Sequence, residues 1–211
     1  MEKQISIENS LLAVIGNSGG KDLIKEASEI AIDHFLQEGI LKDIPVVGTV
    51  ANLFSIGIKT QGYIFTKKLQ RFLFALSDIS FQERQAFTAR LDSDLKFRVR
   101  VGENLILLIN KLDDMDKSEL LARAFSGFVN NRYDYLIFHR LAVAIDRCII
   151  QDLHKLERGN KRLHLEPHEA QILSSAGLVE LEVIPQVRGE GVRNIYQITE
   201  LGDLFCKFIL E

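Results

Sequence analysis

The chain has 211 residues, a length that suits one large domain or two small ones. Hydrophobic residues make up 46% and charged residues 26%, as in globular proteins with a packed core, and the net charge of −3 implies no overall attraction to nucleic acid. The charge is uneven, because residues 59–100 carry nine cations against four carboxylates, whereas residues 161–211 carry five against eight.

The N-terminal part contains a glycine-rich turn and then an amphipathic helix. The glycines at 16–20 precede Lys21, but their spacing does not fit a Walker loop, and Asp22 would repel a phosphate. Apolar residues recur at helical spacing from Lys21 to Gln37, and Gly39 follows as a helix end prefers. The N-terminus lacks the basic start and long apolar run of a signal peptide. We therefore expect a cytoplasmic protein that also acts at the inner face of the membrane.

The run from Ile44 to Ile58 holds 15 residues without a charge. A helix that spans a bilayer core needs about 20 apolar residues, so we expect no stable single span here. Pro45 suits the first turn of a helix, and small residues such as Gly48 and Gly57 let another backbone approach closely. Three interpretations stay open. The run is a buried core helix or hairpin, a segment that enters a membrane or pairs with its own copies after a trigger, or a stretch that only sets the folding register.

A basic flank follows this run, with Lys67, Lys68 and Arg71 set among aromatic and aliphatic residues. Cations beside an apolar segment suit an anionic membrane surface. They suit equally an amphipathic helix whose long side chains reach water while their stems cover the core.

The middle of the chain is predicted to be helical. Ser80 and Glu83 form the pattern of a capping box, which indicates a helix start. Asp113, Asp114 and Asp116 form a carboxylate cluster that we interpret as a solvated turn and cap, since a Mg²⁺ site needs more ligands. The predicted helices cover residues 66–77, 81–91, 92 or 93 to 112, 116 to about 128, and 134–157.

Residues 162–210 alternate between strands and helices. The motifs Ala176-Gly-Leu-Val179 and Tyr196-Gln-Ile-Thr-Glu-Leu-Gly202 resemble the wing and last helix of bacterial winged-helix regulators, over about residues 137–210. The resemblance implies a winged-helix domain with a small antiparallel hairpin. The whole chain is also similar in layout to uncharacterised bacterial proteins, some of which look like abortive-infection or phage-defence components. The predicted elements are a strand at 162–165, a helix at 167–176, strands at 178–184 and 194–198, and a last helix at 199–210.

A DNA-binding role for this domain would need cations on its recognition helix and wing. The predicted helix that begins at Pro167 offers His168 and Gln171 but no Arg or Lys, and Glu166 and Glu169 would face phosphates unfavourably. Protein contact is therefore the favoured role, and DNA binding is the alternative. The residues that would carry DNA binding are Lys161, Arg162, Arg188 and Arg193.

No pattern of catalytic or metal-binding residues appears. The five histidines are scattered, and Cys148 and Cys206 lie in apolar surroundings that favour buried, reduced thiols. Neither C-x-x-C nor H-E-x-x-H spacing is present, and no nucleophile motif occurs. We therefore expect no metal, no cofactor and no enzymatic activity.

The sequence predicts a mainly α protein, with an N-terminal helical bundle at 1–130 that contains the apolar-glycine segment 44–65, and a winged-helix-like domain at 131–211. We expect it to act through contacts with another protein, with its own copies or with an anionic membrane surface, in phage defence among other settings. The alternatives are a DNA-binding regulator and a structural subunit of a larger complex. The predicted contact residues are Gly48, Phe54, Gly57, Lys67, Lys68 and Arg71.

Overall fold

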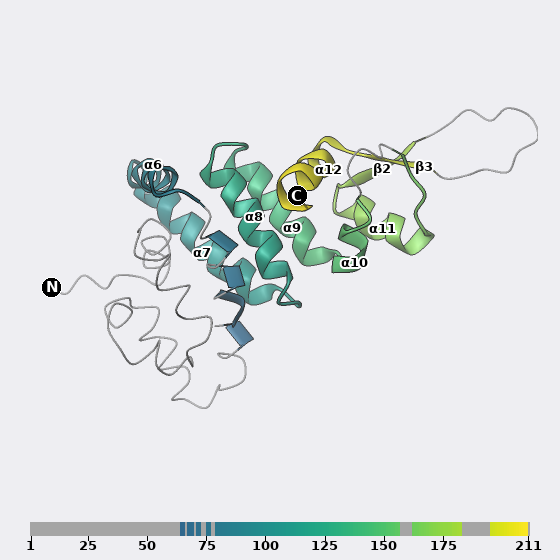
Figure 1. Ribbon diagram of the computed structural model, residues 1–211, viewed down its shortest axis with the longest axis horizontal. Helices are drawn as coiled ribbons and strands as arrows, with labels where there is room; N and C mark the ends of the chain where they lie inside the picture. Colours follow the sequence, from purple (N-terminus) through teal and green to yellow (C-terminus); the bar gives the residue numbers. More distant parts are fainter. Residues whose placement is uncertain are drawn as a thin grey trace, which may run out of the picture. The chain divides into compact units, whose positions relative to one another are not determined.

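The computed structural model describes residues 64–156, 162–182 and 195–210, except positions 66, 70, 73, 74, 77 and 78. The helix expected at 21–37 and the uncharged run lie outside these described residues. The chain divides into two compact units, residues 1–122 and 123–211, and the division falls within helix α8 (Lys117–Val129) (Figure 1).

The first unit contains helices α6 (Phe81–Asp92) and α7 (Leu95–Lys111). Ser80 and Glu83 form the predicted capping box, which fixes the start of α6. Asp94 accepts a hydrogen bond from the Phe97 N–H at 3.0 Å and so caps α7. The apolar face of α7 is fully buried at three positions spaced by four residues, Val101, Leu105 and Ile109.

The second unit begins in α8 and continues with helix α9 (Tyr135–Arg147). Asp134 caps α9, because its carboxylate accepts from the Ile137 N–H at 2.9 Å. Phe125 of α8 and Phe138 of α9 meet edge to face with ring centroids 5.4 Å apart. These rings and the aliphatic residues around them form the core between the two helices.

The prediction of one helix over 134–157 is wrong. The backbone of Cys148 and Ile149 is extended, with ψ of 150° and 140°, so α9 ends at Arg147 and a short helix α10 (Ile150–Leu153) follows. The apolar spacing continues through the break, since Cys148 and Leu153 are both buried. Periodicity alone therefore did not reveal the bend.

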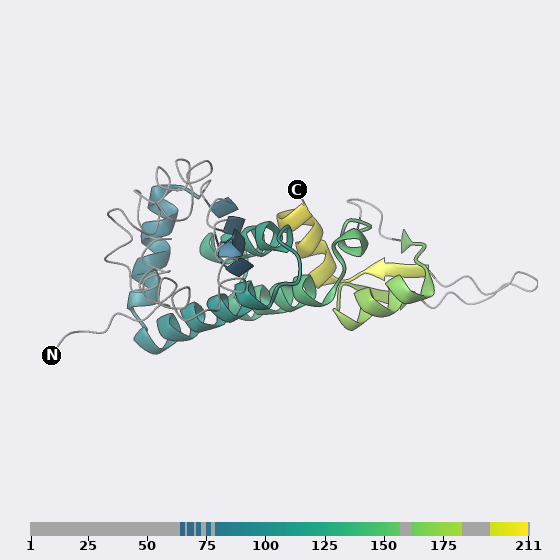
Figure 2. The same cartoon turned by 90° about the horizontal axis from the view of Figure 1, so that it is seen from below.

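The rest of the second unit is a small antiparallel sheet with two helices. Its elements follow the predicted order: strand β1 (Arg162–Leu163), helix α11 (Pro167–Ser175), strands β2 (Val179–Glu182) and β3 (Ile195–Ile198), and helix α12 (Glu200–Phe205), which runs into a π-helical turn at Cys206–Leu210. The strand order is β1-β3-β2, and Leu181 pairs with Tyr196 in the predicted hairpin. Helix α11 lies along the sheet (Figure 2). The described residues are thus mainly α-helical, as predicted.

Thr199 links the C-terminal end of α11 to the N-terminal end of α12. Its hydroxyl donates to the Gly177 carbonyl at 2.6 Å and accepts from the Gly202 N–H at 3.0 Å, while its own N–H donates to the Leu178 carbonyl at 3.0 Å. Gly177 has φ of +76°, a left-handed conformation that glycine adopts without strain. A Cβ on Gly202 would lie 2.2 Å from the Leu178 carbonyl oxygen, so only glycine fits there. The motif residues that suggested the domain therefore hold the end of α11 against the start of α12.

Candidate functional site

The turn between α7 and α8 is acidic. Helix α7 ends at Lys111, the C-cap residue Leu112 is buried and has an extended ψ of 134°, and α8 begins at Lys117. Three aspartates lie between these helices, and the Asp116 N–H donates to the Asp114 carboxylate at 2.8 Å, which keeps the turn compact. We call residues 113–116 the acidic turn.

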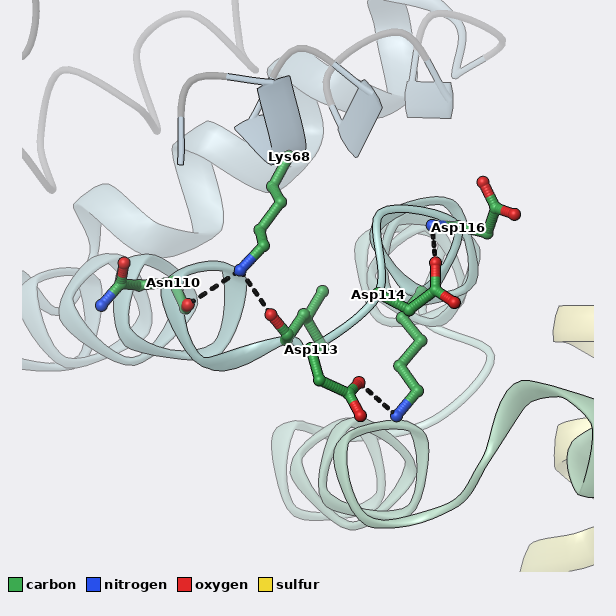
Figure 3. Close-up of polar contacts among 7 residues, drawn as sticks. Lys68, Asn110, Asp113, Asp114 and Asp116 are labelled. Atoms are coloured by element: carbon green, nitrogen blue, oxygen red, sulfur yellow. Dashed lines mark hydrogen bonds and ion pairs between the residues drawn. The ribbon is translucent and has the colours of Figure 1, made fainter. Parts of the chain in front are cut away.

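Lys68 reaches into the C-terminal end of α7. Its ammonium donates to the Asn110 carbonyl at 3.1 Å and to the Leu112 carbonyl, and its side chain is buried (Figure 3). The last carbonyls of a helix have no intrahelical donor and carry a partial negative charge. A lysine there supplies a hydrogen-bond donor and a compensating positive charge. Burial lowers the pKa of Lys68, and the nearby Asp113 carboxylate opposes that effect. Lys68 therefore fastens its segment to α7.

Two ion pairs complete the arrangement. The Arg71 guanidinium donates to the Asp116 carboxylate, with both side chains more than half exposed. The buried Lys117 ammonium lies 2.6 Å from the Asp113 carboxylate, and this hydrogen bond lowers the pKa of Asp113. The acidic turn thus holds one cation from within α8 and one from the segment around Lys68.

This arrangement brings together groups that sequence reasoning kept apart. Lys68 and Arg71 were predicted as contact residues, and Asp113 and Asp116 as a solvated turn. They meet across about forty residues, for example 42 between Lys68 and Asn110. The only sequence signal for the contact was the opposite charge of the two stretches. We call residues 64–72 the basic segment, because it carries Lys67, Lys68 and Arg71.

The arrangement pairs cations with carboxylates and with backbone carbonyls. Within the described ranges, no group of three or more His, Cys, Asp or Glu residues is placed to hold a metal ion. In the same part of the chain, no helix has the length and apolar character that crossing a bilayer requires.

The remaining predicted contact residues are placed as follows. Lys67 is half-buried on the basic segment, whereas Gly48, Phe54 and Gly57 lie outside the described residues. Their contact role stays a prediction. Of the residues that were proposed to bind DNA, Arg162 is described, and Lys161, Arg188 and Arg193 are not.

Arg162 is engaged within the protein. Its guanidinium donates to both carboxylate oxygens of Glu182, at 2.8 and 2.7 Å, across the two outer strands of the sheet. Helix α11 carries no cation, and its buried Glu169 pairs with Lys155, which lowers the pKa of Glu169.

Comparison with protein-family models, with curated protein sequences and with solved structures finds no match for the chain.

Proposed function

We propose that this protein works by contact, with the basic segment as the element that engages an anionic membrane surface. In the resting state the C-terminal end of α7 holds Lys68 and the acidic turn holds Arg71. The observation that carries the proposal is that two carbonyl oxygens at the end of α7 bind the buried Lys68 (Figure 3), whereas Arg71 forms an exposed ion pair with Asp116.

Arg71 is held weakly. Its side chain is 51% exposed and that of Asp116 is 66% exposed. An exposed ion pair contributes about 0–1 kcal/mol to stability, and a basic side chain near an anionic bilayer gains about 1 kcal/mol. Because the two free energies are similar, Arg71 exchanges from Asp116 to a lipid phosphate at little net cost.

Lys68 is held strongly. Its side chain is only 7% exposed, and its ammonium serves two carbonyl oxygens at the end of α7. The Leu112 contact is buried and the Asn110 contact partly buried, and leaving a buried acceptor without a donor costs about 1–3 kcal/mol. Lys68 therefore anchors the segment, while Lys67 and Arg71 supply the first contact with a surface.

This division of roles decides how the proposal is tested. A Lys68→Glu change would set a carboxylate against two carbonyl oxygens, so a loss of binding would report damage to the fold. The informative variant is Lys67→Gln/Arg71→Gln, which keeps the anchor. Its matched control is Lys96→Gln/Arg100→Gln, because both side chains are exposed on α7 and removing them changes the net charge equally.

The experiment is flotation of the purified chain with vesicles of phosphatidylglycerol and phosphatidylcholine, and with vesicles of phosphatidylcholine alone. We expect the wild type and the control to float with the anionic vesicles only, and Lys67→Gln/Arg71→Gln to stay at the bottom. Equal recovery of both variants, or no flotation of the wild type, would remove the membrane proposal.

A further inference from the structure

One face of α9 combines two exposed arginines with the exposed Leu136 and the half-buried Val143. Leu136, Arg140, Val143 and Arg147 follow a spacing of four, three and four residues, which places them on one side of the helix. Leu136 is 56% exposed, and both arginines are exposed. The opposite side holds the fully buried residues of the core. We call these four residues the arginine stripe.

The two arginines of the stripe differ from several other arginines of the described chain. In the ranges that the structure describes, neither Arg140 nor Arg147 makes an ion pair, whereas Arg71, Arg98 and Arg162 each bind a carboxylate. An exposed aliphatic residue lies beyond the helix end, since Ile149 is 54% exposed. Arginine is enriched and lysine is depleted at protein–protein interfaces relative to the rest of the surface.

The same unit also presents an acidic surface. Glu200 and Asp203 lie three residues apart in the first turn of α12, so they share a face, and both are exposed. No ion pair of either carboxylate occurs among the residues described. The described part of the module that contains them, residues 162–182 and 195–210, is acidic as a whole, with six carboxylates against Arg162 and Lys207.

We propose that the arginine stripe binds a second copy of this chain through Glu200 and Asp203. Two unpaired cations on one surface meet two unpaired carboxylates on another, and the aliphatic residues of the stripe add apolar contact. Because the two surfaces differ, the contact is heterologous, and copies join head to tail. Charge complementarity of this kind also speeds association and makes it sensitive to salt. The contact lies outside the basic segment and is independent of the proposed membrane role.

The test is a charge swap on the full chain, followed by sedimentation velocity over a concentration series at low and at high salt. The variants are Arg140→Glu/Arg147→Glu, Glu200→Arg/Asp203→Arg, and the quadruple variant that carries all four changes. Lys96→Glu/Arg100→Glu serves as a control for net charge. Because carboxylates in the first turn also favour α12 through the helix dipole, thermal melting of every variant accompanies the series.

We expect the wild type and the control to associate, more weakly at high salt. Each double variant should weaken association at least about tenfold, and the quadruple variant should restore it. A wild type that stays monomeric at every concentration overturns the inference. So does a double variant that associates like the wild type, or a folded quadruple variant that fails to recover. The proposed membrane role needs neither Arg140 nor Arg147. Flotation of Arg140→Glu/Arg147→Glu with anionic vesicles therefore distinguishes a failure of the self-association proposal from a failure of the membrane proposal.

Discussion

The Lys68 ammonium lies 3.1 Å from the carbonyl oxygen of Asn110, at the end of a helix 42 residues further along the chain. This contact turns a surface-type side chain into part of the core of the first unit. It also ties the basic segment to the C-terminal end of α7.

The first prediction concerns the anchor. Lys68→Met keeps most of the apolar stem but removes the donor to the Asn110 and Leu112 carbonyls. We expect the free energy of unfolding to fall by about 1–3 kcal/mol, because one buried and one partly buried acceptor lose their donor. Urea unfolding monitored by circular dichroism measures the change. Lys96→Met, at an exposed position of α7, should leave the midpoint unchanged; equal midpoints for both variants would assign Lys68 no anchoring role.

The second prediction concerns acid. The hydrogen bond from Lys117 lowers the pKa of Asp113, so the folded state favours the ionised carboxylate. The resulting stability is present above the ordinary carboxylate pKa and is lost as the pH falls through the lowered pKa of the folded state. At neutral pH, Asp113→Asn should lower the free energy of unfolding by about 1 kcal/mol. The effect is small because Asp113 is 74% exposed, so solvent screens the pair. Urea unfolding at neutral and acidic pH should show that the difference in unfolding free energy between variant and wild type disappears in acid. A difference that persists in acid would contradict the stabilising role of the Asp113–Lys117 pair.

The capping boxes and turns were predictable because they are local. Ser80 and Glu83 lie three residues apart, and the side chain of each accepts a hydrogen bond from the backbone N–H of the other. The residue types and their spacing are therefore enough to predict the helix start. Thr199 caps α12 for the same reason, and Gly177 ends α11 in the conformation that glycine favours. The predicted winged-helix identity of the C-terminal module rests on these local features and on the order of its elements.

The candidate site was not predictable in the same way. The residues that neighbour Lys68 in the sequence are compatible with an exposed lysine and with one that binds the end of α7. Only the tertiary fold distinguishes these two placements. The break at Cys148 was missed for a related reason, because the buried spacing of α9 continues into α10 although the backbone does not. Contacts between distant residues, rather than local patterns, position the site.

The third prediction tests the junction at Thr199. In Gly202→Ala the new Cβ would lie 2.2 Å from the Leu178 carbonyl oxygen and 2.6 Å from Ile198 Cγ2. That oxygen already accepts from the Thr199 N–H, so it cannot move without loss of a hydrogen bond. We expect destabilisation of about 1–3 kcal/mol, measured by urea unfolding. Ser174→Ala, exposed on α11, is the control, and a Gly202→Ala protein as stable as that control would refute the packing described.

The fourth prediction concerns Glu169, whose pKa the hydrogen bond from Lys155 lowers, with help from the Glu166 N–H. Lys155→Met should raise the pKa of Glu169 towards that of an ordinary carboxyl group. The stabilisation that this carboxylate provides exists above its ordinary pKa and disappears as the pH falls through its folded value. Titration followed by carboxyl ¹³C NMR measures the shift. Lys207→Met is the matched control, and an unchanged Glu169 pKa in the Lys155 variant would show that the pair is not formed.

The central claim is that the acidic turn competes with an anionic surface for the basic segment. Asp116→Asn removes the partner of Arg71 and leaves Lys68 in place. Glu103→Gln, exposed on α7, removes the same charge elsewhere. Titration with phosphatidylglycerol vesicles should show that Asp116→Asn binds about threefold more tightly than Glu103→Gln, since an exposed ion pair contributes up to about 1 kcal/mol. Equal or weaker binding by Asp116→Asn would contradict the account.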